Sequence, residues 1–498
     1  MNGADLTMQK ILKRATPANQ RASLQIGSAL VVLALFAVYT VVPPGADSMV
    51  LWICVVAQYL IIAASVLRPT VIYRGIPTFV TAEFLFQFFA YLIFFYPYQL
   101  HLLGIYDVSQ SAFLENTYVD ECNQAIILSL IGTISFSAGV RALGISRTSV
   151  EELDRQATRL DDIPGHVLAI PIFTLQVSLI AVYETLGWRA AGEGRYAGQI
   201  DSSPVVEGVY LLIIVLSMIA VALWILPSSK DAGSSTFLAL AAFTAAAWAV
   251  RLLLNGDRNA FLLVAIVYVG GVVTFRLRAG RWLLLALGVI AIPMYNAIEA
   301  FRSGRIGSVL DFFSREGAAA ASYGGDTSFN ITTIGVRAAL ARVPEAIDYG
   351  YGLYKVIGAA GVIPFIRGQI FPADVPYLQS ADVLNDILLG PHARWGVGSN
   401  VIVDAYLDFG VLAVPIMLFG LGVFVAFVQR AVTRMPESPW RSVMYLMTLA
   451  LIAEIPRYSL DFPVRPLVWT LLIFWAVSVS RKQGRPSGRQ PAISRPGA

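Results

Sequence analysis

The sequence alternates between long apolar runs and short polar or charged stretches. A helix that crosses the hydrocarbon core of a bilayer needs about 20 consecutive apolar residues, and about twelve runs approach that length. The runs are continuous and do not alternate residue by residue, so they predict helices and not barrel strands. The predicted spans are residues 26–42, 49–67, 78–97, 124–142, 166–187, 208–227, 236–254, 260–276, 282–299, 407–429, 440–457 and 466–480.

A long segment, residues 300–397, separates the ninth predicted span from the tenth, and a segment of this length is too long for a simple connector. Its stretches "GVRAALARVPEAIDYGYGLYKVIGAAG" and "SADVLNDILLG" mix apolar and polar residues in a way that predicts short helices covering the bundle. The pattern thus predicts an all-α polytopic membrane protein with a large outer helical loop. The predicted parts are a basic tail (1–25), spans one to nine (26–299), the loop (300–406), the last three spans (407–480) and a second basic tail (481–498).

The charges of the connecting stretches predict the orientation, because cytoplasmic loops are enriched in lysine and arginine. Basic residues concentrate in "RALGISRTSVEELDRQATR", "RLRAGR" and the tail "RKQGRPSGRQ", all on the side of the N-terminus. The loop 98–123, on the other side, has acidic residues and no lysine or arginine. We therefore expect both termini in the cytoplasm and the long loop outside.

Composition agrees with a membrane protein and excludes several chemistries. Apolar residues make up 57% of the chain and charged residues 14%, whereas soluble domains carry roughly a quarter charged residues. Cys54 and Cys122 are too few for a disulfide framework, and we expect them to be unpaired. No histidine–cysteine metal motif, nucleotide-binding loop or serine-hydrolase elbow is present. The sequence predicts no metal site, no cofactor and no nucleic-acid partner.

The basic residues on the predicted outer side are nearly all arginine. The guanidinium group is a planar fork that binds phosphate oxygens in pairs, so an outward-facing cavity lined with arginine suits a diphosphate. The alternative is that the chain simply prefers arginine to lysine everywhere, and that Arg258, in "NGDRNA", reaches the outer surface beside Asp257. The candidate anion-binding residues are Arg189, Arg195, Arg258, Arg367, Arg394 and Arg457.

The stretch "RWGVGSNVIVDAYLDFG" places polar residues at the entrance of the tenth predicted span. Asn400, Asp404 and Asp408 are four apart and share one face of a helix. An ionisable residue at the edge of a span indicates function, although water at interface depth could satisfy Asp408. His392, just before this stretch, is the single histidine of the long loop. Glu83, with Gln87 one turn away, is either a buried structural pair or part of a lipid path.

The outer arginines, the late outer loop and three stretches together resemble the Wzy-type polysaccharide (O-antigen) polymerases. The stretches are "NGDRNAFLL", "GVIPFIRGQIFPADVP" and Trp395 to Gly410. These polymerases look like relatives of the O-antigen ligases, with a GT-C-like membrane fold. The resemblance implies a metal-independent glycosyltransferase of the bacterial inner membrane that acts on the periplasmic face.

The resemblance also implies a substrate and roles for individual residues. The enzyme would transfer a growing glycan from an undecaprenyl diphosphate donor to a lipid-linked repeat unit. Outer arginines would hold the diphosphate, His392 or Asp404 would take the acceptor proton, and Asn400 and Asp408 would bind the acceptor sugar. The lipid bilayer, a chain-length regulator and a flippase are the expected partners.

Two alternatives remain open at this point. An O-antigen ligase, which transfers finished glycan to the lipid A core, shares the architecture. A flippase for lipid-linked oligosaccharides, or another secondary transporter, is disfavoured because transporters often show internal repeats and midplane polar sites. The sequence has no visible repeat, and its polar residues gather on the outer side.

Overall fold

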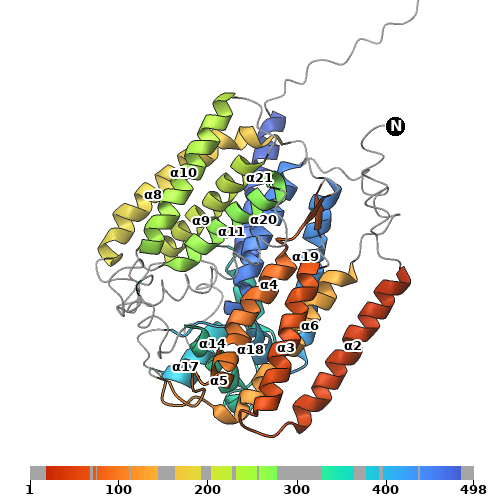
Figure 1. The fold of residues 1–498 in the computed structure, drawn as a ribbon. Coiled ribbons are helices and arrows are strands. Elements are labelled where there is room, and N and C mark those ends of the chain that lie inside the picture. The colour runs from red at the N-terminus through yellow and green to blue at the C-terminus, as the bar shows by residue number, and fades with distance from the viewer. Residues whose placement is uncertain are drawn as a thin grey trace, which may run out of the picture.

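A computed structural model of the chain shows a bundle of helices with a cap of short helices at one end (Figure 1). The structure describes residues 18–67, 71–73, 76–111, 114–143, 163–191, 204–226, 232–254, 257–277, 314, 328–363, 377–391, 396–435 and 438–483.

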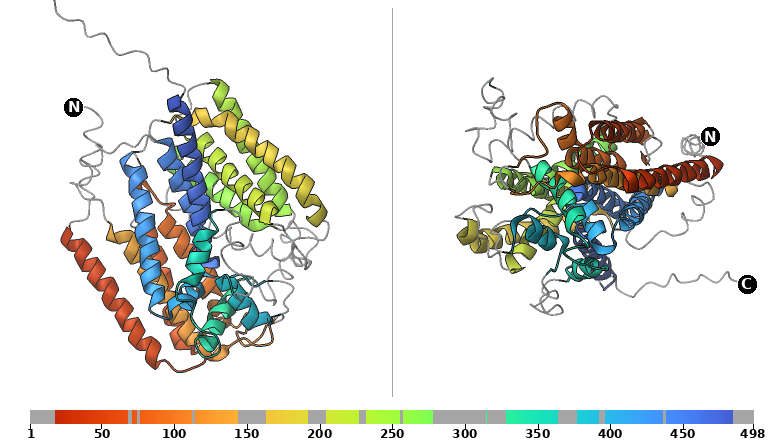
Figure 2. Two further views of the ribbon diagram at one scale, coloured as in Figure 1. Left: turned by 180° about the vertical axis from the view of Figure 1, so that it is seen from behind. Right: turned by 90° about the horizontal axis from the view of Figure 1, so that it is seen from below.

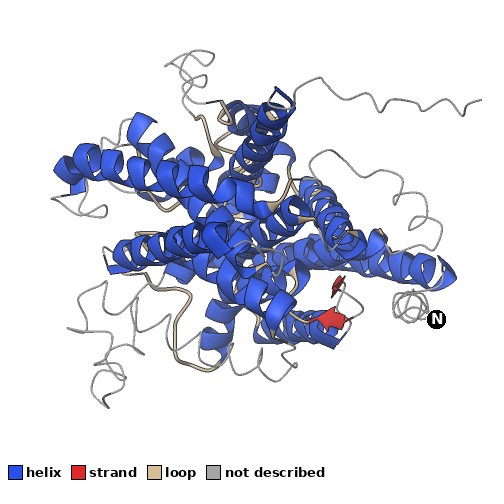
Figure 3. Cartoon of the chain, turned by 90° about the horizontal axis from the view of Figure 1, so that it is seen from above, coloured by secondary structure: helices blue, strands red, loops and turns tan. Residues whose placement is uncertain are grey.

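The first half of the bundle contains most of the long helices. The α-helices of this half are α2 (Ala18–Val41), α3 (Ser48–Leu67), α4 (Ala82–Ala90), α5 (Tyr96–Leu102), α6 (Cys122–Ala142), α8 (Ala169–Ala191), α9 (Pro204–Ile225), α10 (Ala232–Leu254) and α11 (Arg258–Gly271), of which α4 and α5 are short. The short elements among them are β1 (Val71–Tyr73), β2 (Ile76–Thr78), η1 (Tyr91–Phe95), η2 (Val119–Glu121), η4 (Gly165–Leu168) and η5 (Val272–Arg276). Apart from the antiparallel pair β1–β2, the described residues of this half are helical or lie in connecting loops (Figure 3).

The second half supplies the cap and three long helices. We call α14 (Ser328–Arg342), α15 (Leu353–Ala360), α17 (Ser380–Leu389) and α18 (Val401–Phe409) the cap. The long helices are α19 (Ala413–Arg434), α20 (Pro439–Glu454) and α21 (Val464–Gln483), and the short helix η7 (Ile455–Arg457) follows α20. The cap lies over the middle of the bundle when the molecule is seen from below (Figure 2). The short helices predicted for this part of the chain are therefore present.

Seven helices in the described residues are long and apolar enough to cross a membrane. They are Ala22–Val41, Ser48–Leu67, Val119–Ala142, Val206–Ile225, Thr236–Leu253, Arg258–Arg276 and Ala413–Arg434. Two shorter apolar helical stretches, Ala169–Thr185 and Val464–Ser480, match two further predicted spans. The all-helical membrane class is confirmed; the predicted span 282–299 lies outside the described residues.

Helix α20 is the centre of the bundle. Every residue from Arg441 to Glu454 is buried, because α20 packs against α4, α9, α11 and α19. These contacts join the group α8–α11 to the group formed by α3, α4, α6 and α19. The two groups are visible on either side of α20 in Figure 1.

The predicted start of the tenth span, 407–429, was wrong. The structure places one short helix, α18, before a separate long helix, α19. Gly410 ends α18 with a positive φ of 73°, a conformation that glycine adopts without the strain that a side chain brings. Asp404 and Asp408 therefore belong to the cap and not to a membrane span.

Contacts inside the bundle test the interpretations of Glu83 and of the two cysteines. Glu83 pairs with Arg141 of α6 at 2.9 Å, while Gln87 donates to Thr133 O and Ser137 Oγ, so Glu83 and Gln87 are not a pair. The cysteines Cys54 and Cys122 are free and buried, as predicted.

Glycines of α6 and α19 bring the backbones of these two helices into direct contact. A Cβ atom added at Gly139 would lie 2.1 Å from the backbone oxygen of Phe419, and one added at Gly422 would lie 2.2 Å from that of Phe136. Small residues let membrane helices approach until their backbones touch. The packing of α6 against α19, the most extensive in the molecule, depends on this absence of side chains.

We expect Gly422→Ala to destabilise the protein by about 1–3 kcal/mol, because the methyl group forces α6 and α19 apart. Gly420→Ala is the matched control, since nothing lies within 4 Å of its added Cβ. Thermal unfolding of the detergent-purified variants measures the difference. Equal midpoints for the two variants would show that the close approach is not needed.

Candidate functional site

A cavity of about 200 Å³ lies between α9, α11 and the segment that follows α20. Its wall is mostly apolar and comes from residues of four helices: Leu211, Ile214, Val215, Met218, Ala260, Leu263, Leu451 and Pro466. Its polar lining comes from Tyr210, Asp257, Asn259 and Tyr458. An apolar cavity with a few polar groups on one side is the usual form of a small-molecule site.

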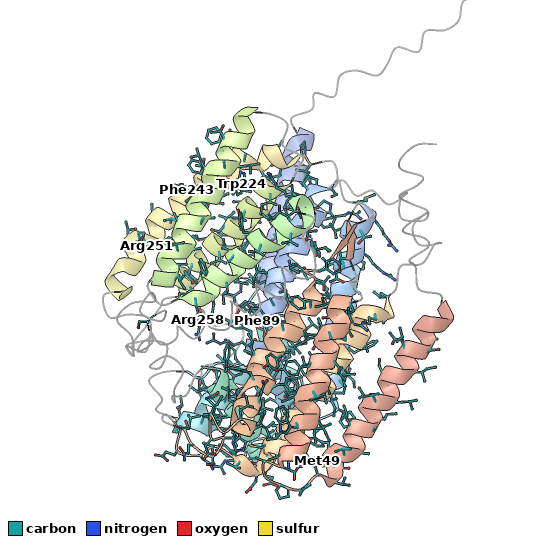
Figure 4. All side chains as sticks on the ribbon, in the orientation of Figure 1. Met49, Phe89, Trp224, Phe243, Arg251 and Arg258 are labelled. Atoms are coloured by element: carbon teal, nitrogen blue, oxygen red, sulfur yellow. The ribbon has the colours of Figure 1, made fainter. Side chains whose placement is uncertain are left out.

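The polar groups of the cavity are placed by the start of α11. Asp257 is the N-cap residue, and its Oδ1 accepts hydrogen bonds from the backbone N–H groups of Asn259 and Ala260. Its other carboxylate oxygen accepts a hydrogen bond from the hydroxyl of Tyr210. An aspartate in this position satisfies the first N–H groups of a helix. Asp257 thereby fixes Arg258 and Asn259 in the first turn of α11. Arg258 lies at the end of α11 that is nearer the cap helices (Figure 4).

The segment 455–463, which we call the connector, supplies the opposite side of the cavity. Arg457 Nη1 donates to Asn259 Oδ1 over 3.2 Å, and the amide of Asn259 donates to the hydroxyl of Tyr458. The ring of Tyr458 stacks on that of Phe462 with centroids 4.1 Å apart. Asn259 thus joins the start of α11 to the connector.

Two arginines that are 199 residues apart in the sequence lie near the same buried carboxyl group, that of Glu454. Arg258 is buried with 3% of its surface exposed, and Arg457 is half-buried. Both guanidinium groups act electrostatically on the carboxyl group of Glu454, the last residue of α20. Two guanidinium groups in a partly dry site provide strong, directional binding for an anion with several oxygens.

A second polar cluster lies in the cap, around Lys355 of α15. Its Nζ is 2.6 Å from Asp404 Oδ2 and 2.9 Å from Asp408 Oδ2. The two aspartates are 1% and 0% exposed, so the contact is an ion pair within the protein interior. Both carboxylates face Lys355, which confirms that Asp404 and Asp408 share one face of a helix.

Asp404 makes further hydrogen bonds that join separate parts of the chain. Oδ1 accepts from Ser380 Oγ of α17 at 2.7 Å. Oδ2 accepts from the backbone N–H of Leu460, in the connector, also at 2.7 Å. Both oxygens of Asp404 are thus engaged, and the connector is held to the cap through this residue.

Asn400 and Asp408 are also occupied by protein groups. Asn400 is the N-cap of α18: its Oδ1 accepts from Ile402 N and Val403 N, and its Nδ2 donates to Thr332 O. Asp408 Oδ1 accepts from the backbone N–H of Gly352 at 3.1 Å. The predicted polar stripe of α18 therefore faces α14 and α15.

Burial and charge shift the proton affinities of the Lys355 cluster. Burial alone would lower the pKa of Lys355, but Asp404 and Asp408 outweigh it and raise the pKa above its ordinary value. Burial raises the pKa of Asp408 against the opposing effect of Lys355, and burial raises the pKa of the neighbouring Asp461. Lys355 stays protonated at neutral pH, so the ion pairs persist there.

The structure does not test the remaining predicted residues. Arg195, Arg367, His392 and Arg394 lie outside the described residues, and Arg189 lies in α8 without a described side chain. Among the described residues, no group of three or more histidine, cysteine, aspartate or glutamate side chains could hold a metal ion.

Sequence reasoning missed Lys355, Asn259 and Glu454 as members of these clusters. Lys355 had a signal, because it is the only lysine in a long segment whose other basic residues are arginine. Asn259 lies inside the stretch "NGDRNAFLL", but its bonds to Arg457 and Tyr458 depend on distant chain segments. Glu454 stands at the end of an apolar run, and no sequence pattern around it indicates that it belongs to a site.

The described fold is that of a multi-pass helical membrane protein with a mostly apolar cavity, and Arg258 and Arg457 directly precede the cavity-lining residues Asn259 and Tyr458. The family model of the O-antigen polysaccharide polymerase Wzy matches residues 25–481. The chain therefore belongs to the Wzy family of O-antigen polysaccharide polymerases, in agreement with the resemblance seen in the sequence. No curated protein and no solved structure matches the chain. Family membership supports polymerisation of O-antigen repeat units by a glycosyltransferase-like enzyme of the inner membrane.

We expect Lys355→Met to destabilise the protein strongly, because it leaves Asp404 and Asp408 buried without their cation. Removing one partner of a buried pair costs about 3–5 kcal/mol. Thermal unfolding in detergent tests this, with the triple variant Lys355→Met, Asp404→Asn, Asp408→Asn as the control that removes the stranded charges. A triple variant no more stable than the single one would contradict the electrostatic explanation.

Proposed function

We propose that the chain transfers a growing glycan from an undecaprenyl diphosphate donor to the non-reducing sugar of a lipid-linked repeat unit. The observation that carries the proposal is that Arg258 and Arg457 both lie near Glu454, and that each directly precedes a residue that lines a cavity with apolar walls. A lipid diphosphate combines an anionic group with a hydrocarbon chain, and this site offers partners for both. Family membership supports the polymerisation itself.

In this proposal the two arginines bind the diphosphate and stabilise it as it leaves. Charge grows on the bridging oxygen as its bond to the anomeric carbon breaks, and fixed positive groups in a dry site lower the energy of that state. The reaction requires no metal, because guanidinium groups supply the positive charge. Arg189, Arg195, Arg367 and Arg394 remain proposed contacts of the diphosphate or the glycan.

The proposed topology has about twelve spans with both termini in the cytoplasm. The cap and the cavity then face the periplasm, where lipid-linked repeat units are joined. The seven described candidate spans, and the position of the cap at one end of the bundle, support this arrangement. A flippase would deliver the repeat units, and a chain-length regulator would set how many are joined.

The cap residues take a positioning role in this proposal. Asp404 holds the connector through Leu460 N–H, and the connector carries Tyr458 to the cavity and Arg457 to Asn259. Asp408 and Asn400 hold α18 in place under the acceptor side of the site. His392 remains a proposed participant in acceptor binding.

Deletion of the gene, followed by complementation, tests the proposal in cells. We expect the deletion strain to carry single repeat units in place of long chains, and Arg258→Ala or Arg457→Ala to restore few long chains. Arg342→Ala is the matched control, because Arg342 is exposed on α14. Gel analysis of surface polysaccharide, with immunoblots for protein abundance, gives the readout.

The outcomes separate the alternatives. Long chains that persist in the deletion strain would overturn the polymerase proposal. Long chains that accumulate without attachment to the lipid A core would indicate a ligase instead. Long chains at normal length in the Arg258 and Arg457 variants would remove these residues from the site.

Addition of a chelator tests whether the reaction requires a metal ion. We expect purified protein supplied with lipid-diphosphate-linked repeat units to form polymer at the same rate with and without EDTA, since guanidinium groups stabilise the leaving group. A rate that falls with EDTA and recovers on addition of a divalent cation would contradict this mechanism.

A further inference from the structure

Glu454, at the end of α20, is buried in an unusual state. Only 3% of its surface is exposed, and in the part of the chain that the structure describes its Oε1 atom has no hydrogen-bond partner. A buried carboxylate oxygen without a hydrogen-bond partner is costly, and each such atom in a native protein needs an explanation. Glu454 therefore calls for a specific explanation.

The surroundings of Glu454 connect it to the cavity. Leu451, one helical turn earlier on α20, lines the cavity, so Glu454 lies on the same side of the helix. The positive charges of Arg457 and Arg258 attract its carboxylate, and the negative charge of Asp257 repels it. Tyr458, just beyond Arg457, lines the cavity as well.

Two other carboxylates in this region, those of Asp257 and Asp404, are already occupied. Asp257 caps α11 and accepts a hydrogen bond from Tyr210. Asp404 is bound by Lys355, Ser380 and the N–H of Leu460. A carboxylate paired with a lysine and with both oxygens engaged is a poor proton acceptor. Glu454 differs from both because it retains an oxygen that can accept a proton.

We propose that Glu454 is the general base that takes the proton of the acceptor hydroxyl; this inference rests on the proposed function. The acceptor oxygen forms a bond to the anomeric carbon of the donor glycan. The bond between that carbon and the diphosphate oxygen breaks, and its electron pair leaves with the diphosphate. The acceptor proton moves to Glu454 and passes to water before the next transfer.

The arginines make this assignment consistent with the charges of the site. Before the donor binds, Arg258 and Arg457 stabilise the ionised form of Glu454. The two guanidinium groups thus favour the form of the side chain that can accept a proton.

Glu454→Gln tests the assignment, because the amide keeps the shape of the side chain and removes the proton acceptor. With purified protein and lipid-diphosphate-linked repeat units, we expect kcat to fall about 10²-fold or more, the usual contribution of a general base, while KM for the donor stays close to that of the wild type. Glu207→Gln is the matched control, because Glu207 is exposed in the first turn of α9.

Added formate distinguishes chemistry from structure. We expect formate to restore part of the rate of Glu454→Ala, since it can enter the space of the missing carboxylate and accept the proton. A folded Glu454→Gln protein with wild-type kcat would overturn the inference, and so would a Glu454→Ala protein that formate does not rescue. If the wild-type protein itself forms no polymer in this assay, the proposed function is wrong. If the wild type forms polymer and the Glu454 variants behave like it, only the inference about Glu454 is wrong.

Discussion

The carboxylate of Asp404 is the contact on which the arrangement of the cap and the connector depends. It binds Lys355 of α15, Ser380 of α17 and the backbone N–H of Leu460 in the connector, while it is itself part of α18. These segments are distant in the sequence, and a charge that is 1% exposed must find all its partners for the fold to be stable. The cap helices and the connector therefore take their positions together. Lys355 extends the constraint to Asp408, which holds the turn before α15 through Gly352.

This constraint determines the geometry of a cavity that the cap itself does not line. All the residues that line the cavity come from α9, the start of α11, α20 and the segment from Tyr458 to Pro466. The connector is nevertheless held by Asp404, so the positions of Arg457 and Tyr458 depend on the cap. On the other side of the cavity, Asp257, the N-cap residue of α11, fixes Arg258 and Asn259. The buried helix α20 stands between the two sides, and its last residue, Glu454, lies where they meet.

The sequence predicted the parts of this arrangement that local patterns determine. Hydropathy identified the long helices, because a bilayer demands long apolar runs. It placed the start of the tenth span too early, because the apolar pattern continues from α18 into α19 across Gly410, where backbone conformation ends the helix. Arg258 and Arg457 were predicted from their places at helix ends; both lie near the carboxyl group of Glu454, and their role in anion binding stays a prediction. The partners of Asp404, Glu83 and Asn259 were not predictable, since Lys355, Arg141 and Arg457 approach them only through tertiary packing.

The comparison of the carboxylates shows why polar residues at the edges of apolar segments do not by themselves locate the chemistry. Asp257, Asp404 and Asp408 lie at such edges, and each is held by helix N–H groups, a tyrosine or a lysine. Their charges stabilise turns and helix ends, and a proton acceptor with such partners gains little from taking another proton. Glu454 lies at a similar edge, but its Oε1 has no hydrogen-bond partner among the described residues, whereas the Oδ2 of Asp408 lies 2.9 Å from Lys355 Nζ. What separates a structural carboxylate from a reactive one is therefore the set of partners it has in the folded protein. By this criterion the proton transfer belongs to the end of α20, beside Arg258 and Arg457, and the aspartates of α18 hold that site in place.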